Sequence, residues 1–485
     1  MKNIKIIFAL MLLLIFASCK KEVYSLDQKT MEINAFVWKA MNAYYLWKND
    51  VPDLSDSKFE SQKDLNRYLE KHSDSKRFFE HLIYDREHID KWSWIVDDYK
   101  ALIRYFQGER VSSGMKIGLV REAQGSDNLF AYVQFVLPDS DAATKGIQRG
   151  NVFRIIDNQR ITVQNYQDLL SHDSYDIELA TWNGNNLEDT GTVIHLSKTS
   201  LQENPIFIKK VIRQNGKKIG YLMYNGFTST YDSQLNAAIS YFQSEGIDDL
   251  IVDLRYNHGG SVASMQYFAS MITGSFTGKT FLKYEWHPDM QAWMQNQYPE
   301  SLKRDFINKM SGGEAINNLN LNRIYFITTK SSASASESLI NCLKPYINVT
   351  QIGTETHGKY VASITLFDSP DFGYVPEDIN PNHKWAIQPI VLKVANANNE
   401  TDFVNGLPAD IYQHENYQNL GILGNETEPL LQRTLQEILG TTAPVYKPTG
   451  SFEEIYYTQD QFEDEMYLER ESLKFMGAWR KLKAE

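Results

Sequence analysis

The chain has 485 residues, which is more than one ordinary domain and predicts two or three. Hydrophobic residues make up 42% and charged residues 23%, a balance typical of globular proteins and not of disordered or fibrous ones. The formal net charge of -12 argues against a nucleic-acid partner, because phosphate binding draws on clustered lysine and arginine side chains. No metal-ligand pattern such as H-E-x-x-H is present, so we expect neither a metal nor a cofactor.

The first residues are predicted to be a targeting segment, with a signal peptide over residues 1–18. Lys2 and Lys5 form a positive start, and residues 6–17 are an uninterrupted apolar run of 12 residues. A run of this length fits a signal peptide and is too short for a bilayer span, which takes about 20 residues. The run ends just before Cys19 and resembles a bacterial lipobox, with Phe16 in place of the usual aliphatic residue.

This resemblance implies that Cys19 becomes the lipid-modified first residue of the mature chain. We therefore expect secretion across the inner membrane and lipid anchoring in the cell envelope, at the outer membrane on its periplasmic or surface face. The alternative is an ordinary cleaved signal that happens to contain a cysteine. The second cysteine, Cys342, then has no disulfide partner, and the apolar stretch SLINCL around it predicts a core residue rather than a thiol nucleophile.

Residues 19–110 are predicted to form a helical domain rich in aromatic side chains. Apolar residues recur at helical spacing along its first segment, at Ile33, Val37, Met41, Tyr44 and Tyr45. A later segment that contains Trp92, Trp94 and Ile95 is expected to be helical as well. The aromatic cluster at residues 44–47 is expected to pack in the core, with a ligand-binding surface as the alternative.

Residues 111–202 change to short β-type runs separated by turns. Strands are predicted over residues 129–136, 152–156, 176–181 and 191–196. The stretch LPDSDAATKGIQRGNVFRIIDNQRI resembles the peptide-binding PDZ module, although Asp141 replaces a frequent proline and Asn151 a frequent aspartate. Such modules add a peptide strand to a sheet edge and hold its terminal carboxylate with backbone amides. The resemblance places the carboxylate loop and the pairing strand in GMKIGLV, which begins at Gly114.

Residues 203–440 alternate predicted strands with predicted helices. Strands are expected over residues 219–224, 249–254 and 324–328, and helices over residues 233–244 and 262–272. This alternation implies βαβ units and a mainly parallel core sheet. Within this region, residues 280–316 are predicted to be an insertion rich in tryptophan and tyrosine, either a substrate lid or an ordinary loop. The predicted fold class is therefore multidomain α/β, with a tail over residues 441–485 that carries no chemical motif.

The stretch ITTKSSASASESLINCLK is the most informative part of the chain. A predicted strand ends near Thr328, small residues follow, and an apolar helix begins near Glu337. A serine at such a junction lies close to free backbone amides and to the positive end of the helix dipole, which favour an alkoxide and an oxyanion. The alternative is structural, because Ser334 and Glu337 also fit a capping box in which Ser334 only caps the helix.

Two further polar segments follow predicted strands, where the loops of an open α/β sheet gather a site. They are DLRYNHGG, which ends at Gly260, and GTETHGK, which ends at Lys359. Together with SASASE and the late NGLPAD they resemble the C-terminal processing peptidases, or tail-specific proteases, a serine–lysine family that carries a PDZ module. The resemblance covers residues 112–436, and the helical N-terminal part is similar to that of lipoprotein-type members.

The resemblance implies a role for each matching residue. Ser334 would be the nucleophile, Lys359 its general base, and the amides of Gly260 and Ala335 would stabilise the oxyanion. A lysine can act as a base when burial and positive dipoles favour its neutral amine. Many members carry a glutamine four residues after the lysine, where this chain has Ser363, so the group that orients Lys359 stays open.

The expected activity is that of a serine endopeptidase that forms an acyl-enzyme on a polypeptide bound by its C-terminal end. Two alternatives are carried forward. One is a non-catalytic lipoprotein that binds peptides or proteins on a hydrolase scaffold, and the other is a hydrolase that acts on a non-peptide acyl group. His258 and His357 lie near the motifs and are expected to be turn or wall residues rather than bases. The oligomeric state stays open, a homo-oligomer included.

Overall fold

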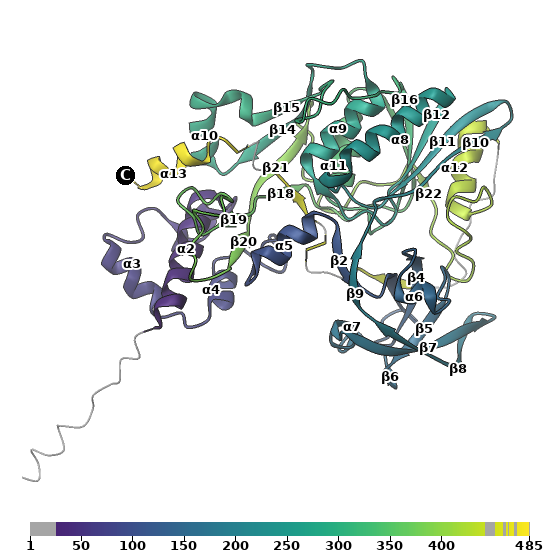
Figure 1. The fold of residues 1–485 in the computed structure, drawn as a ribbon, viewed down its shortest axis with the longest axis horizontal. Helices are drawn as coiled ribbons and strands as arrows, with labels where there is room; N and C mark the ends of the chain where they lie inside the picture. Colours follow the sequence, from purple (N-terminus) through teal and green to yellow (C-terminus); the bar gives the residue numbers. More distant parts are fainter. Residues whose placement is uncertain (1–25, 442–451, 459–461, 464, 470–472, 485) are drawn as a thin grey trace, which may run out of the picture.

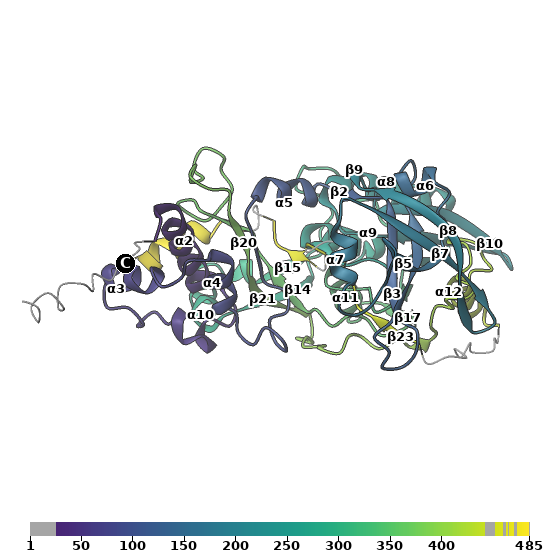
Figure 2. The same cartoon turned by 90° about the horizontal axis from the view of Figure 1, so that it is seen from below.

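The computed structural model describes residues 26–441, 452–458, 462–463, 465–469 and 473–484. The predicted signal peptide and Cys19 lie outside these residues. Among the described residues, no helix is both long enough and apolar enough to cross a membrane. Both views of the chain place the N-terminal helices at one end and the sheet formed by residues 115–197 at the other, with the large α/β part beside that sheet (Figures 1 and 2).

The N-terminal part is helical up to residue 81 and then changes character. Its elements are α2 (Gln28–Tyr44), η1 (Lys48–Asp50), η2 (Pro52–Leu54), α3 (Gln62–Leu69), α4 (Ser75–His81), β1 (Trp94–Val96) and α5 (Tyr99–Phe106). The side chain of Asp27 caps α2 by accepting a hydrogen bond from the Thr30 amide. Tyr44 and Tyr45 are fully buried, so the cluster at 44–47 packs in the core and the ligand-surface alternative is wrong.

The helix expected around Trp92 and Trp94 is also wrong. Residues 94–96 form the strand β1, which pairs antiparallel with β20 (Ala386–Gln388) of the α/β part. The opposing strand satisfies the backbone groups of this short segment, and aromatic and β-branched residues are well suited to such a half-buried strand. This pairing joins the N-terminal part to the catalytic-motif region of the chain.

Residues 115–197 form an antiparallel sheet with two short helices. The sheet order is β23-β3-β4-β5-β7-β8, with β6 beside β5. Its own elements are β3 (Met115–Arg121), β4 (Leu129–Val136), α6 (Asp141–Thr144), β5 (Val152–Ile156), β6 (Gln159–Arg160), α7 (Tyr166–Ser171), β7 (Ser174–Asn183) and β8 (Asn186–Ser197). The strands that flank this part along the chain, β2 (Glu109–Ser112) and β9 (Thr199–Gln202), pair antiparallel as a separate two-stranded sheet.

The α/β part is built on a six-stranded sheet in the order β10-β11-β12-β16-β17-β22. Strands β11 to β22 pair in parallel and β10 is the antiparallel edge. The strands are β10 (Ile206–Gln214), β11 (Lys217–Tyr224), β12 (Asp249–Asp253), β16 (Arg323–Thr328), β17 (Asn348–Gly353) and β22 (Ile411–Tyr412). The helices are η3 (Ser229–Tyr231), α8 (Asp232–Glu245), α9 (Val262–Thr273), α11 (Ala335–Leu343) and α12 (Pro429–Leu439).

Alternate residues of these strands point to opposite faces, and both faces are covered. Leu250 and Val252 pack with α8, α9 and α11. Ile251, between them, packs with α12 on the other face. Burial on both sides explains why the sequence of β12 is a continuous apolar run rather than an alternating one.

A second sheet has the order β13-β24-β18-β21-β14-β15. Its strands are β13 (Gly260–Ser261), β24 (Met466–Tyr467), β18 (Val361–Ser363), β21 (Ile390–Asn396), β14 (Thr280–Trp286) and β15 (Lys303–Asp305); α10 (Pro288–Gln297) and η4 (Pro299–Leu302) follow β14, and β19 (Leu366–Phe367) pairs with β20. The expectation that residues 280–316 form a lid or loop is therefore corrected. Phe281 and Leu282 are fully buried in β14, whose pairing with β21 makes it an integral strand.

The described parts of the tail return to the body of the protein. The strand β23 (Glu453–Ile455) joins the edge of β3, and β24 enters the second sheet. The last helix, α13 (Met476–Ala484), packs on α2, where the Trp479 indole donates a hydrogen bond to the Ala43 carbonyl. Figure 1 shows α13 beside α2 and α10.

Candidate active site

Three loops meet at one edge of the six-stranded sheet. They follow β12, β16 and β17, which are parallel neighbours, so their carboxyl ends lie side by side. The first loop is held by the buried Arg255, whose guanidinium pairs with Asp253 at 2.7 Å and with Glu428 at 2.7 Å. The loops therefore form a rigid platform rather than independent surface segments.

The three serines of SASAS have different surroundings. The hydroxyl of Ser332 donates to the Leu254 carbonyl at 2.7 Å, and that of Ser336 donates to the Asn257 carbonyl at 3.0 Å. These two hydrogen bonds connect the loop that contains Ser334 to the loop that follows β12. The Ser334 hydroxyl is buried and has no hydrogen-bond partner among the described residues. Of the three, Ser334 is the one whose hydroxyl is not committed to holding the fold.

Ser334 also has an unusual backbone. It lies at φ 66° and ψ −116°, directly before α11, a region that costs a non-glycine residue on the order of 1–3 kcal/mol. The capping box expected from the sequence is present through the Glu337 carboxylate, which accepts the Ser334 amide, while the Ser334 hydroxyl has no hydrogen-bond partner among the described residues. The strained turn places the Ser334 hydroxyl at the N-terminus of α11, beside Gly259.

The Glu337 carboxylate connects the loop that contains Ser334 with the loop that contains Lys359. One carboxylate oxygen accepts the amides of Ser334 at 2.7 Å and Lys359 at 2.9 Å. The other accepts the Gly358 amide at 2.6 Å and the Thr356 hydroxyl at 2.5 Å. Sequence reasoning treated Glu337 only as the fourth residue of a capping box, which is the signal that could have identified it. Its larger role depends on a loop 22 positions further along the chain.

Lys359 is fully buried and lies between aromatic and acidic side chains. Its Nζ is 3.6 Å from a carboxylate oxygen of Glu465 and 5.8 Å from the ring centroid of Trp92. The Ser363 hydroxyl donates to the other Glu465 oxygen at 2.5 Å and accepts from Gln388 Nε2 at 2.9 Å. Gln388 of β20 is therefore connected to Glu465 through the Ser363 hydroxyl. The glutamine of many family members stands instead four residues after the lysine.

The two glycines of NHGG, Gly259 and Gly260, are required by close contacts to different neighbours. A Cβ on Gly259 would come within 2.6 Å of Ser334 Cβ, so this position must stay glycine. The Gly259 amide already donates to the Asn257 side chain at 2.9 Å. Gly260 has φ +134°, and a Cβ there would lie 2.3 Å from the Phe227 carbonyl oxygen. Ala335 is the first residue of α11, where amides have no partner within the helix.

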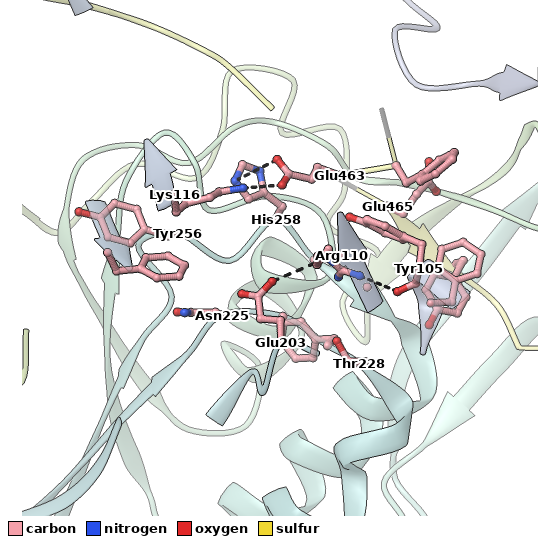
Figure 3. A pocket seen from close by; sticks show the side chains of 18 residues that line it. Tyr105, Arg110, Lys116, Glu203, Asn225, Thr228, Tyr256, His258, Glu463 and Glu465 are labelled. Carbon is pink, nitrogen blue, oxygen red and sulfur yellow. Dashed lines mark hydrogen bonds and ion pairs between the residues drawn. The ribbon is translucent and has the colours of Figure 1, made fainter. Parts of the chain in front are cut away.

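The two histidines line the wall of the site. The His357 ring stacks on Tyr456 with centroids 3.9 Å apart, and His258 Nδ1 lies 3.4 Å from the Tyr456 hydroxyl. His258 Nε2 is 3.9 Å from a Glu463 oxygen. Figure 3 shows a pocket on this side of the site, with dashed lines that join the Glu463 carboxylate to Lys116 and to His258. Within the described ranges, no group of three or more His, Cys, Asp or Glu residues is placed to hold a metal ion.

The pH dependence of Glu337 yields a first testable prediction. Burial raises the pKa of Glu337 to about 7, and its four hydrogen bonds act in the opposite direction. A pKa raised above the unfolded value stabilises the protein below about pH 4.5, and this contribution is lost as the pH rises through about 7. The change is on the order of 3 kcal/mol, since one pKa unit corresponds to about 1.4 kcal/mol. Catalytic turnover should change in the opposite direction and fall below pH 7, because a protonated carboxyl cannot accept all four bonds.

The variant Glu337→Gln tests this prediction, with the exposed Glu426→Gln as the matched control. The carboxamide turns an NH₂ group toward backbone donors, so we expect about 10²-fold lower kcat/KM and about 2–4 kcal/mol lower stability. The measurements are urea unfolding and kcat/KM at pH 5.5 and 8.5. Glu337→Gln should flatten the difference in unfolding free energy between the two pH values. A wild-type pH profile in that variant would remove Glu337 from the explanation.

Two family profiles match the chain. Peptidase family S41 matches residues 218–376, and the Peptidase S41 N-terminal domain matches residues 32–94. The carboxyl-terminal-processing protease of Picosynechococcus sp. is 23% identical over 186 residues, which are 38% of this chain and 39% of that protein. The probable CtpA-like serine protease of Staphylococcus epidermidis is 26% identical over 165 residues, which are 34% of this chain and 30% of that protein. The chain matches well under two thirds of the length of either relative.

Two solved structures resemble most of the fold, each over 84% of this chain. An S41 protease from Bacteroides fragilis has a TM-score of 0.62 at 24% identity and covers 84% of this chain and 97% of that one. The photosystem II D1 C-terminal processing protease has a TM-score of 0.50 at 16% identity and covers 84% of this chain and 98% of that one. At these identities the likeness concerns the fold.

Proposed function

We propose that this chain, which belongs to peptidase family S41, is a serine endopeptidase of the C-terminal processing type with a Ser334–Lys359 dyad. The observation that carries the proposal is that one carboxylate, that of Glu337, binds the backbone amides of both Ser334 and Lys359. Glu337 holds the backbone of Ser334 and of Lys359 in one place, and Ser334 keeps its hydroxyl uncommitted. Most buried hydroxyls have a hydrogen-bond partner; among the described residues of this segment those of Ser334 and Ser338 have none, and Ser334 in addition lies beside Gly259 at the start of α11.

In the proposed acylation step, Ser334 Oγ forms a bond to the scissile carbonyl carbon. The neutral amine of Lys359 takes the hydroxyl proton, and the carbonyl oxygen becomes an oxyanion. The amides of Gly260 and Ala335 are assigned to the oxyanion. The Gly259 amide is a poorer candidate, because the Asn257 side chain already accepts from it. The oxyanion then collapses, the C–N bond breaks, and the lysine ammonium returns the proton to the leaving amine.

The second half-reaction frees the enzyme. A water molecule gives a proton to Lys359 and adds to the acyl carbon, and the ester bond to Ser334 Oγ breaks as the hydroxyl regains a proton from Lys359. The amide donors serve again for the second tetrahedral intermediate. This route needs no group besides the residues named here, water and the substrate.

Residues 111–202 are assigned to substrate capture as a PDZ-like domain. In support, β3 lies at the edge of an antiparallel sheet and accepts a further strand there, the geometry that strand addition requires. The remaining assignments are a helical domain over 19–110, a catalytic domain over 203–440 and lipid attachment at Cys19. The substrate is a polypeptide, bound through its C-terminal end.

Two measurements test this proposed function. A fluorophosphonate probe should label the protein, and mass spectrometry should place the label on the tryptic peptide that contains Ser334. A protein with an unstructured, free C-terminus should be cleaved internally, at least about 10-fold faster than the same protein with an amidated C-terminus. Absence of both labelling and cleavage would instead favour a peptide-binding lipoprotein, and cleavage of esters without polypeptides would favour a non-peptide hydrolase.

A further inference from the structure

The described residues of the tail follow the same path that a substrate strand would take. The strand β23 pairs antiparallel with β3, with Glu453 opposite Arg121 and Ile455 opposite Leu119. Ile455 and Tyr457 also pack on the hydrophobic core of residues 115–197. The edge assigned to substrate capture is therefore already covered by a strand of the same chain.

Two acidic side chains of the tail, Glu463 and Glu465, lie beside the lysines Lys116 and Lys359. Glu463 forms an ion pair with Lys116 of β3 and lies 3.9 Å from His258. Lys116 and Glu463 are only 13% and 10% exposed, so this pair is well shielded from solvent screening. Figure 3 shows Lys116 and Glu463 joined across the pocket, with Glu465 nearer to Tyr105.

Glu465 carries the tail into the catalytic centre. Its carboxylate lies 3.6 Å from Lys359 Nζ and accepts hydrogen bonds from Trp94 Nε1 at 2.7 Å and from Ser363. The Glu465 carbonyl oxygen lies 2.8 Å from the point that a Cβ on Gly259 would occupy, and Ser334 Cβ lies 2.6 Å from that same point. The tail backbone therefore crosses directly in front of the nucleophile.

The next two residues complete the occupation of the site. Met466 and Tyr467 form β24, which pairs in parallel with β13 at Gly260 and with β18 at Ser363. Met466 is fully buried and Glu465 is 4% exposed. A substrate strand that reaches Ser334 would need the space that these residues fill.

We propose that the described tail residues 452–458, 462–463 and 465–469 are an intramolecular ligand of the peptide-binding edge and the active site, and that a substrate strand must displace them. The surface selects an extended peptide that places an acidic side chain beside Lys116, as Glu463 does in the tail. The proposal rests on the proposed function and deepens it. The occupied state is inactive because the tail fills the space that a substrate strand needs, with the Glu465 carboxylate 3.6 Å from Lys359 Nζ.

Deleting the tail is a poor test, because Phe475 and Trp479 are buried against the N-terminal helices. A reversible lock is sharper. In an antiparallel pair, Cβ atoms of opposite residues lie about 4.5–5.5 Å apart, and a disulfide accepts Cα separations of about 4.4–6.8 Å. The double variant Arg121→Cys/Glu453→Cys should therefore form a disulfide that holds β23 on β3.

The expected result is at least about 10-fold lower kcat/KM in the oxidised double variant than after reduction. The matched control is Asp176→Cys/His195→Cys, an exposed cross-strand pair of β7 and β8 in the same sheet. Its disulfide should change kcat/KM by less than about 2-fold. Equal activity of the oxidised and reduced Arg121→Cys/Glu453→Cys protein would overturn the proposal, since the tail would then be a permanent part of the working enzyme.

A binding measurement separates this proposal from the proposed function. A fluorescent synthetic peptide with the sequence of residues 452–469 is titrated into the lock variant that also carries Ser334→Ala, and anisotropy is recorded. Reduced protein should bind the peptide, and oxidised protein should bind at least about 10-fold more weakly. This result would support the intramolecular ligand even if no form of the protein cleaved a substrate. Equal binding to both forms would contradict it even if cleavage were observed.

Discussion

Ser334→Ala is expected to lower kcat/KM for a polypeptide substrate by at least about 10³-fold, because no neighbouring hydroxyl can replace the nucleophile. The hydroxyls of Ser332 and Ser336 are both committed to backbone carbonyls of the adjoining loop. Substrate binding should persist, so the loss should appear in kcat rather than in KM. The measurement is steady-state cleavage of an unstructured protein, followed by mass spectrometry of the products.

Two companion variants sharpen this prediction. Ser334→Gly removes the same hydroxyl but relieves the backbone strain at φ 66°, so it should unfold at a free energy about 1 kcal/mol higher than Ser334→Ala. Ser332→Ala should show the reverse pattern, with activity within about 10-fold of wild type and stability lower by about 1 kcal/mol. Wild-type turnover in Ser334→Ala, or a larger loss of turnover in Ser332→Ala, would assign the nucleophile to another residue.

Lys359→Met is expected to have an equally large effect on activity and an added effect on stability. Methionine keeps most of the side-chain volume but cannot accept a proton, so kcat/KM should fall at least about 10³-fold. The change also removes the cation that lies 3.6 Å from the buried Glu465 carboxylate. Breaking a buried pair on one side lowers stability by about 3–5 kcal/mol. Urea unfolding and substrate cleavage measure the two effects separately.

The double variant Lys359→Met/Glu465→Gln separates catalysis from packing. Removing both charges should restore most of the lost unfolding free energy and none of the activity. Lys359→Arg serves as the charge control, because arginine keeps the cation and stays protonated at any working pH. Cleavage at wild-type rate by either Lys359→Met or Lys359→Arg would show that Lys359 is not the base.

Several site features could be predicted because they depend on local order in the chain. The strand before Ser334, the helix after it and the loop that ends at Gly260 are visible as short apolar runs followed by small or polar residues. Strands that alternate with helices place their carboxyl ends together, so Ser334 and Lys359 could be assigned to one edge of a sheet. Burial of Ile33, Val37 and Met41 in α2 follows in the same way from helical spacing.

Other features depend on contacts between distant segments. Residues 94–96 and 280–286 carry no local signal that separates a strand from a helix or loop, and their pairing partners lie far along the chain. Glu337 fits a capping box on its own, and the Lys359 and Gly358 amides alone reveal its second role. The sequence leaves open which group orients Lys359, because Ser363 stands where many family members have a glutamine; in the structure Gln388 reaches Ser363 from a strand 25 positions away.

The sequence by itself located a serine at a strand–helix junction and a lysine after the next parallel strand, the pair that is proposed to carry the chemistry. Tertiary structure alone decided what surrounds that pair. Glu465 meets Ser363 across 102 positions, and Glu463 meets Lys116 across 347. A tail with no motif of its own can occupy an active site in this way because strand pairing is made by backbone groups that every residue carries. Only the assembled sheets show which edge they cover.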